Sequence, residues 1–177
     1  MRDVDAVPEP QRQLLSDIVA EWQARPTTRA DRGLPARDAA AAGAFALLVG
    51  ASDTGKTMAA EWIANKLRLD LHRVDLSAVM GKYIGETEKN LQRLFDSAER
   101  AGAILFFDEA EALFGRRGDV KDSHDRYANV TVEWLLERMK TYRGVAVLAT
   151  TSREEIDSAF LERIRHVVPF TRPAEGR

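Results

Sequence analysis

Short apolar stretches alternate with amphipathic segments along most of this chain. Four stretches that are apolar almost throughout and one less apolar stretch predict β-strands: residues 44–49, 103–109, 144–150, 166–170 and 71–76. Four intervening segments with helical spacing predict α-helices: residues 57–67, 86–101, 126–142 and 154–164. Buried strands that alternate with helices are typical of a parallel sheet covered by helices on both faces, so the pattern predicts an α/β fold.

The first 38 residues have a different pattern. Residues 10–24 carry an apolar stripe on a polar segment and predict one helix that docks on its own domain: Leu14, Leu15, Ile18, Val19 and Trp22. Residues 25–38 contain Arg, Pro and Gly and read as a connector. We therefore divide the chain into an N-terminal helix and connector, residues 1–38, and a main domain, residues 39–177.

Composition narrows the possible classes of protein. Apolar residues make up 45% and charged residues 31%, which is typical of a globular chain rather than a disordered one. A net charge of −2 gives no general attraction to nucleic acid or to anionic membranes. The absence of cysteine excludes disulfides and thiolate metal sites. The apolar run at residues 39–49 is too short to span a bilayer, and we expect a soluble, cytoplasmic protein.

The sequence GASDTGKT, residues 50–57, has the outline of a phosphate-binding loop. In such a loop the backbone amides surround phosphate oxygens, and the N-terminus of the next helix adds further amides. Lys56 is expected to reach the β- and γ-phosphates, and the Thr57 hydroxyl to ligate Mg²⁺. The motif predicts ATP and Mg²⁺ as cofactors, with nucleotide contacts from Gly50, Ala51, Ser52, Asp53, Thr54, Gly55, Lys56, Thr57 and Met58.

Two acids end the predicted strand at residues 103–109, directly after five apolar residues. Asp108 is expected to hold Mg²⁺, directly or through water. Glu109 is expected to orient and polarise the water that attacks the γ-phosphate. The acidic pair therefore predicts the catalytic half of an ATP-hydrolysing site.

Three stretches taken together resemble the AAA+ ATPases: residues 50–57, residues 82–117 (KYIGETEKNLQRLFDSAERAGAILFFDEAEALFGRR) and residues 148–165 (LATTSREEIDSAFLERIR). The likeness is greatest to the AAA group of hexameric remodellers and protein unfoldases. The stretch KDSHDRYAN, residues 121–129, resembles bacterial stand-alone members, some of which accompany contractile injection systems. The resemblance covers about residues 44–170.

The resemblance implies a P-loop NTPase fold, with a five-stranded parallel sheet in the order 5-1-4-3-2, and a ring that is usually hexameric. Residues 39–177 then correspond to the large, nucleotide-binding subdomain. Lys82, Tyr83 and Ile84 match the pore loop, whose aromatic residue holds a translocating polypeptide. Arg163 and Arg165 match arginine fingers that reach the γ-phosphate of the next subunit, and Thr151 falls on a polar position at a strand tip.

The sequence departs from the family at several positions. Asp53 stands where Gly is usual, Ala51 where Pro is usual, Thr151 where Asn is usual, and Glu162 where a basic residue is common. The family continues into a small helical lid over the adenine. This sequence ends at Arg177, soon after the last predicted strand, so we expect the lid to be absent.

The sequence favours a Mg²⁺-dependent ATPase that forms the motor core of a protein remodeller, acts as a homo-oligomer on a protein substrate, and has no nucleic-acid or membrane partner. A nucleotide-binding assembly or regulatory module with little turnover is the main alternative, because of Asp53, Thr151 and the absent lid. Action on DNA is disfavoured by the lack of a basic stripe. A P-loop kinase is disfavoured by the Asp108–Glu109 pair followed by two arginines.

Overall fold

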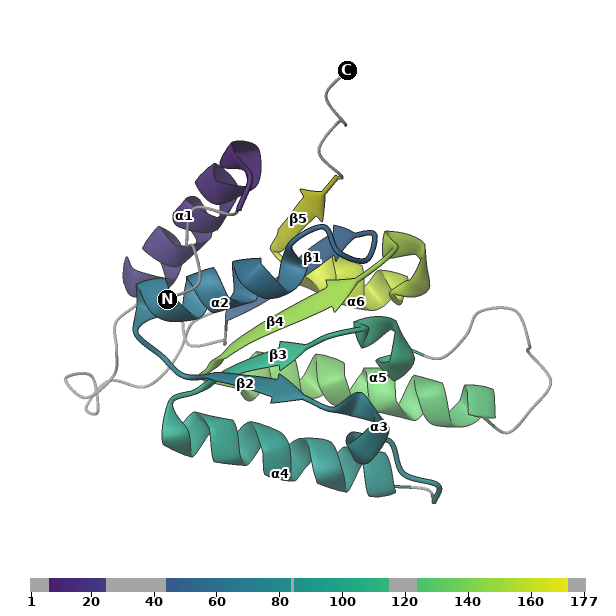
Figure 1. The fold of residues 1–177 in the computed structure, drawn as a ribbon. Coiled ribbons are helices and arrows are strands. Elements are labelled where there is room, and N and C mark those ends of the chain that lie inside the picture. The colour runs from purple at the N-terminus through teal and green to yellow at the C-terminus, as the bar shows by residue number, and fades with distance from the viewer. Residues whose placement is uncertain (1–6, 25–43, 84, 115–123, 172–177) are drawn as a thin grey trace.

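The computed structural model describes residues 7–24, 44–83, 85–114 and 124–171, with residues 124–130 described as backbone alone. Figure 1 shows the predicted α/β architecture, in which a central sheet is flanked by helices. The five parallel strands lie in the order β2-β3-β4-β1-β5, which confirms the predicted order. Their bounds are β1 Ala44–Gly50, β2 Leu71–Val74, β3 Ile104–Phe107, β4 Val145–Thr150 and β5 His166–Phe170.

The helices complete the alternation that the sequence predicts. They are α1 Glu9–Ala24, α2 Lys56–Leu67, α3 Leu76–Val79, α4 Glu86–Ala101, α5 His124–Thr141 and α6 Ser158–Arg163, with 3-10 turns η3 Ala110–Leu113 and η4 Arg153–Glu155. The expected continuous helix at residues 154–164 is wrong. The side chain of Asp157 accepts a hydrogen bond from the amide of Ala159, so α6 begins directly after Asp157. Ile156, which lies between η4 and α6, is buried in the core.

The predicted strand at residues 71–76 is also too long. It ends at Val74, because Asp75 has its side chain bonded to the amide and the hydroxyl of Ser77 and thereby caps the short helix α3. The apolar pattern alone did not reveal this capping residue as a strand end.

Side chains of β1 divide the core into two halves. Ala46 and Leu48 belong to the half formed with α1 and α2, whereas Phe45 and Leu47 belong to the half formed with α4, α5 and α6. This alternation follows from the two-residue period of a strand, and it explains why both faces of the sheet need a cover. In Figure 1, α2 and α1 lie on one side of the sheet and α4 and α5 on the other.

The N-terminal helix docks on the main domain, as expected. Leu15, Ile18, Val19 and Trp22 are buried, but Leu14 is exposed, because one residue along a helix turns the side chain by about 100° away from the buried stripe. The proposed division at residues 38 and 39 stays a prediction, because it lies outside the described residues. Within the described ranges, no helix is long and apolar enough to cross a membrane.

Candidate functional site

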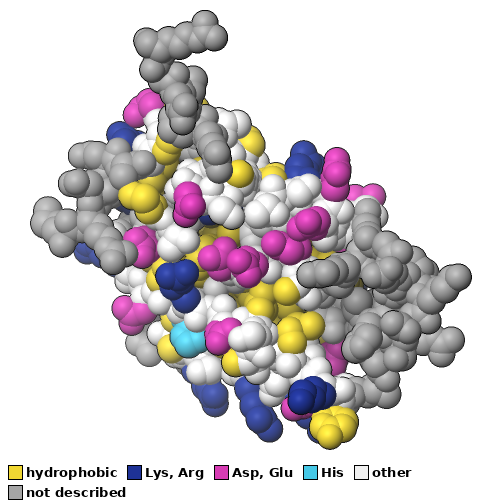
Figure 2. All heavy atoms as spheres, turned by 45° about the vertical axis from the view of Figure 1, so that its right-hand side comes forward, with side chains coloured by type: hydrophobic (Ala, Val, Ile, Leu, Met, Phe, Trp, Pro, Cys, Tyr) yellow, Lys and Arg dark blue, Asp and Glu magenta, His cyan; other side chains and the backbone are white. Residues whose placement is uncertain are grey.

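All five strands are parallel, so their carboxyl ends meet along one edge of the sheet. A cleft of about 470 Å³ lies at this edge. Acidic side chains gather across the middle of the face seen in Figure 2. The cleft is lined by Ser52, Asp53, Gly55, Lys56, Thr57, Met58, Asp108, Glu109, Glu111, Ala149, Thr150 and Thr151. The structure therefore brings the predicted phosphate loop, both predicted acids and Thr151 together in one place.

Gly50 ends β1 and begins the loop. A Cβ atom at this position would lie 2.4 Å from the carbonyl oxygen of Phe170 and 2.9 Å from Oγ1 of Thr54. The close approach of β5 is the reason that the structure gives for glycine at this position. Gly50 is therefore a packing requirement between two neighbouring strands.

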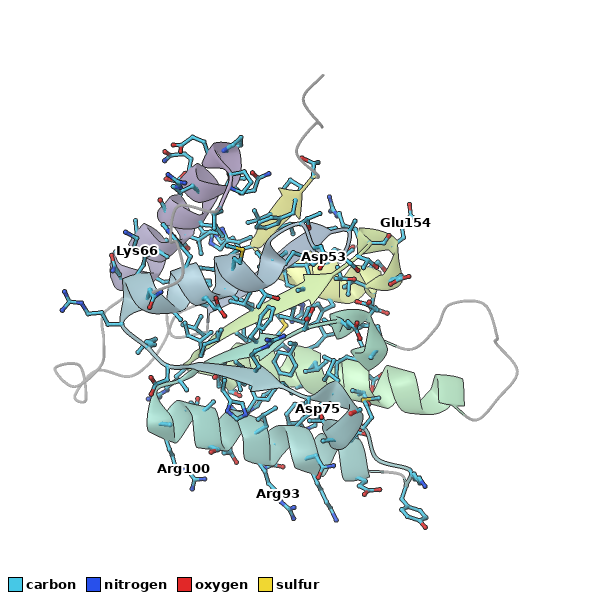
Figure 3. All side chains as sticks on the ribbon, in the orientation of Figure 1. Asp53, Lys66, Asp75, Arg93, Arg100 and Glu154 are labelled. Atoms are coloured by element: carbon cyan, nitrogen blue, oxygen red, sulfur yellow. The ribbon has the colours of Figure 1, made fainter. Side chains whose placement is uncertain are left out.

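The loop then turns through two left-handed residues. Asp53 has φ of +62°, and Gly55, which precedes α2, has φ of +99° with open space where a Cβ would stand. The Thr54 hydroxyl donates to the carbonyl oxygen of Ala51 at 2.7 Å and closes the turn. Figure 3 shows Asp53 in the loop that joins β1 to α2. A left-handed angle explains why Gly is the common residue at the position of Asp53, and Asp tolerates this conformation better than most residues.

Lys56 is the buried cation of the cleft. Its ammonium donates hydrogen bonds to the carbonyl oxygens of Gly50 and Ala51, the second at 2.7 Å. Burial lowers the pKa of Lys56, while the negative charges of Asp108, Glu111 and Asp53 act in the opposite direction. A partly desolvated cation among acids is suited to binding a polyanion together with a counter-cation.

The two predicted acids lie in a turn at the end of β3. The amide of Glu109 donates to Oδ1 of Asp108 at 2.9 Å, and Glu109 has φ of +53°. Oδ2 of Asp108 lies 3.8 Å from Nη2 of Arg73, a residue of β2. The Asp108 carboxylate is therefore contacted from two sides, while the Glu109 side chain is exposed at the cleft.

Glu111 is a cleft residue that our sequence analysis missed. Its Oε2 atom is buried and has no hydrogen-bond partner among the described residues. The available signal was its place in the sequence, because Glu111 lies in η3, which directly follows the two predicted acids.

Thr151 lines the cleft as an exposed residue, whereas its neighbour Thr150 is buried. The hydroxyl of Thr150 donates to the carbonyl oxygen of Ser152 at 3.2 Å. Of the two threonines, Thr151 is therefore the one whose side chain is accessible to a bound molecule.

The residues present fit Mg²⁺ bound together with a nucleotide. Thr57 and Asp108 offer oxygen ligands in one cleft, and Oε2 of Glu111, which has no hydrogen-bond partner in the described part of the chain, adds a further oxygen. Among the described residues, no group of three or more His, Cys, Asp or Glu could hold a metal ion unaided. This set fits Mg²⁺ because that ion takes few protein ligands and completes its shell with phosphate oxygens and water.

Comparison with known proteins identifies the family. The model of the AAA family (ATPase family associated with various cellular activities) matches residues 46–172. The chain belongs to the AAA family. This confirms the resemblance inferred from the motifs, and the parallel sheet with its strand order is consistent with the P-loop NTPase fold of that family.

Three relatives illustrate the similarity. An AAA family ATPase of Sinorhizobium fredii is 35% identical over 129 residues, which are 72% of this chain and 38% of the relative. A proteasome-activating nucleotidase of Methanoculleus marisnigri is 39% identical, over 65% of this chain and 29% of the relative. A cell division cycle protein 48 homolog of Archaeoglobus fulgidus is 34% identical, over 65% of this chain and 16% of the relative. The chain thus matches less than two fifths of the length of each of these relatives.

The described residues of the predicted pore loop, Lys82 and Tyr83, do not line the cleft. Tyr83 is 79% exposed, and Lys82 is exposed beside it. Oε2 of Glu86 accepts hydrogen bonds from the amides of Lys82 at 3.1 Å and Tyr83 at 3.2 Å. Ile84 lies outside the described residues. The first turn of α4 therefore holds the base of a loop that presents an aromatic side chain to solvent.

The two arginines that match AAA arginine fingers also lie away from the cleft of their own chain. Arg163 is the last residue of α6, and Arg165 directly precedes β5. Both are exposed. Nη1 of Arg165 lies 2.9 Å from Oε1 of Glu21 in α1. Nothing in the sequence separates these two arginines, but their surroundings in the fold differ.

Proposed function

We propose that this AAA protein binds ATP with Mg²⁺ and hydrolyses it, as the motor core of a ring-forming protein remodeller. One observation carries the proposal: Lys56 and the adjacent pair Asp108 and Glu109 come from two separate parts of the sequence and line the same cleft at the carboxyl edge of the sheet. A cation that binds phosphate, an acid that binds metal and an acid that activates water are the groups that hydrolysis of a phosphoanhydride needs.

The phosphates are bound by the loop and by Lys56. The ammonium now donates to two loop carbonyls, and it would exchange these bonds for the more strongly bonding oxygens of the β- and γ-phosphates. Thr57 and Asp108 would hold Mg²⁺, which neutralises phosphate charge when it is bound. Gly55 leaves open space where other residues carry a Cβ, so phosphate oxygens can approach the amides at the start of α2.

Glu109 is assigned to the attacking water. Its carboxylate would accept a hydrogen bond from the water, orient it in line with the γ-phosphate and take up its proton. The bond from the water oxygen to phosphorus would form as the bond from phosphorus to the bridging oxygen breaks and ADP leaves. The exposed hydroxyl of Thr151 lies in the same cleft and is assigned to the water or the γ-phosphate as a hydrogen-bond donor. Both roles follow from the chemistry of the side chains and from their shared position.

The remodeller part of the proposal rests on likeness and on exposure. The relatives include proteins named proteasome-activating nucleotidase and cell division cycle protein 48 homolog. An exposed aromatic residue such as Tyr83 can hold many kinds of peptide by apolar contact. We therefore propose a protein substrate, a homo-oligomeric ring with arginines acting between subunits, and a place in the cytoplasm, without nucleic-acid or membrane partners.

Binding and turnover of ATP test the proposal separately. Lys56→Ala is expected to weaken ATP binding by more than about tenfold and to abolish turnover, because it removes the phosphate-binding cation. Glu109→Gln is expected to retain binding and to lower turnover by at least about 100-fold, which is the lower range for loss of a general base. Glu154→Gln is the matched control, because Glu154 is exposed and does not line the cleft. Turnover by Glu109→Gln at the parent rate would contradict the assignment.

A second candidate, a nucleotide-binding assembly or regulatory module with little turnover, is favoured by the Asp53 carboxylate. Asp53 lines the phosphate cleft and influences Lys56 by its charge. A single-turnover assay with and without unfolded protein substrates separates the two candidates. Turnover that a protein stimulates supports the remodeller, whereas tight binding with turnover that no protein stimulates supports the module.

A further inference from the structure

Helix α1 lies along the edge strand β5 and contacts it near both ends. Nε2 of Gln11 donates to the carbonyl oxygen of Pro169 at 3.0 Å. Toward the other end of β5, the ring of Trp22 meets the ring of His166 edge-on, with 6.3 Å between the centroids. Figure 1 shows α1 beside β5 and α2. This helix therefore forms part of the surroundings of the turn that carries the two arginines.

The carboxylate of Glu21 joins α1 to that turn. Its Oε1 atom lies 2.9 Å from Nη1 of Arg165, and its Oε2 atom lies 2.9 Å from Nε2 of His166. The Glu21 side chain is 28% exposed and the Arg165 side chain 74%. Four buried residues anchor α1 on the domain: Leu15, Ile18, Val19 and Trp22. The helix therefore holds the Glu21 carboxylate in a fixed position. The Arg165 guanidinium therefore already forms an ion pair within its own chain.

Arg163 has a different environment. In the described part of the chain, no hydrogen bond or ion pair joins its exposed side chain to another residue. Its charge contributes to the lowered pKa of Glu137, but the hydrogen bond from Lys140 is the largest cause. Nζ of Lys140 lies 2.8 Å from Oε1 of Glu137, so that carboxylate already has a closer partner. Arg163 is therefore available to a group outside its own chain.

We propose that Glu21 is a positioning residue that holds Arg165 on α1 and fixes the turn between α6 and β5, so that Arg163 is the arginine that reaches a nucleotide bound by a second copy of the chain. This inference rests on the proposed ATPase function. The ion pair through Nη1 directs the Arg165 guanidinium toward α1, whereas no such contact in the described part of the chain directs that of Arg163 away from a neighbouring copy. An exposed ion pair shifts an equilibrium by only about fivefold or less, so Glu21 biases Arg165 rather than locking it.

Turnover with three variants tests the division of roles. Arg163→Ala is expected to lower turnover by about 1,000-fold or more, as loss of an arginine finger does. Arg165→Ala and Glu21→Gln are each expected to lower it by about two- to fivefold, with ATP affinity unchanged, because both act through the position of Arg163. Asp17→Asn is the matched control, because Asp17 is an exposed acid one turn earlier on α1. A loss of about 1,000-fold for Arg165→Ala, or unchanged turnover for Glu21→Gln, would overturn the proposal.

Two further readouts distinguish positioning from contact with phosphate. The double variant with Glu21→Arg and Arg165→Glu, assayed at pH 8, is expected to recover most of the turnover that either single change removes. A phosphate-binding Arg165 would give no recovery. Mixing Lys56→Ala with Arg163→Ala is expected to restore turnover, because the first protein supplies Arg163 to the intact site of the second; no restoration would contradict a role between chains.

A thermal measurement keeps the inference testable if the parent chain does not hydrolyse ATP, an outcome that would count against the proposed function alone. Glu21→Gln and Arg165→Ala are each expected to lower Tm by about 2 °C, as loss of a partly exposed ion pair does in a chain of this size. The double variant with Glu21→Gln and Arg165→Ala is then expected to be no less stable than the less stable of the two single variants. Additive losses would show that Glu21 does not hold Arg165.

Discussion

The backbone amide of Glu109 donates a hydrogen bond to the carboxylate of Asp108, with 2.9 Å between the nitrogen and Oδ1. Glu109 has φ of +53°, a left-handed conformation that costs an ordinary residue about 1–2 kcal/mol. At this residue the chain leaves β3 and enters η3, so both acids come to line the cleft. The strained turn thus allows two adjacent residues, Asp108 and Glu109, to line the same cleft.

Replacing Glu109 tests this strain. We expect Glu109→Gly to have a free energy of unfolding about 1 kcal/mol higher than Glu109→Ala, because glycine adopts positive φ without a clash at Cβ. Both variants lack the carboxylate, so both should lose turnover while the more strained one is also the less stable. Urea denaturation followed by circular dichroism measures the difference. Equal stability of the two variants would show that this turn stores no strain.

The charge of Asp53 should weaken nucleotide binding. Asp53→Asn removes the charge and keeps a residue that tolerates φ of +62°, so we expect ATP to bind up to about fivefold more tightly. Asp53→Gly should tighten binding similarly and also relieve the backbone. Asp53→Ala is the control for shape, since it removes the charge but retains the strain. Titration calorimetry measures the affinities, and unchanged or weaker binding by Asp53→Asn would show that the carboxylate is harmless or useful.

Glu86 should control the order of the loop that carries Tyr83. Glu86→Ala removes the acceptor of two amide hydrogen bonds, each worth about 1 kcal/mol, so the loop should open more often. We expect chymotrypsin to cleave after Tyr83 about tenfold faster in this variant, with ATP affinity unchanged. Glu86→Gln keeps a side-chain oxygen that can accept these bonds and should be cleaved at nearly the parent rate. Equal cleavage of Glu86→Ala and the parent would show that the contact does not order the loop.

The sequence predicted best where several local signals agree. Helix α4 begins and ends where predicted, because a strongly amphipathic segment is bounded by Gly85 and Gly102, both in left-handed conformations. The phosphate loop and the two acids were found because each motif is short and follows an apolar strand. The position of the strand ends at one edge then follows from parallel pairing.

The features that were missed depend on contacts over long distances or on single capping residues. Asp75 and Asp157 end the predicted elements early through side-chain bonds to nearby amides, and an apolar pattern does not register such bonds. The bond between Glu21 and Arg165 joins residues that are far apart in sequence. No spacing rule identifies such a pair, so the two arginines looked equivalent until the fold placed α1 beside β5.

Tyr142 offers a test of the core and of its response to pH. Its side chain is fully buried, and its hydroxyl has no hydrogen-bond partner among the described residues. Burial, followed by the charge of Glu99, raises the pKa of Tyr142 to about 12. Tyr142→Phe removes the unsatisfied hydroxyl, and we expect the free energy of unfolding at pH 7 to rise by about 1 kcal/mol.

The same shift predicts a difference at high pH. The phenol of Tyr142 ionises more readily in the unfolded chain than in the folded one. Above the unfolded pKa, release of this proton therefore favours unfolding. Ionisation of Tyr142 therefore leaves the stability of the parent unchanged below about pH 10, the usual pKa of tyrosine, and lowers it as the pH rises toward the folded pKa of about 12. Urea denaturation at several pH values should show the parent losing stability relative to Tyr142→Phe across this window. Parallel curves for the two proteins would show that Tyr142 titrates alike in the folded and unfolded chain.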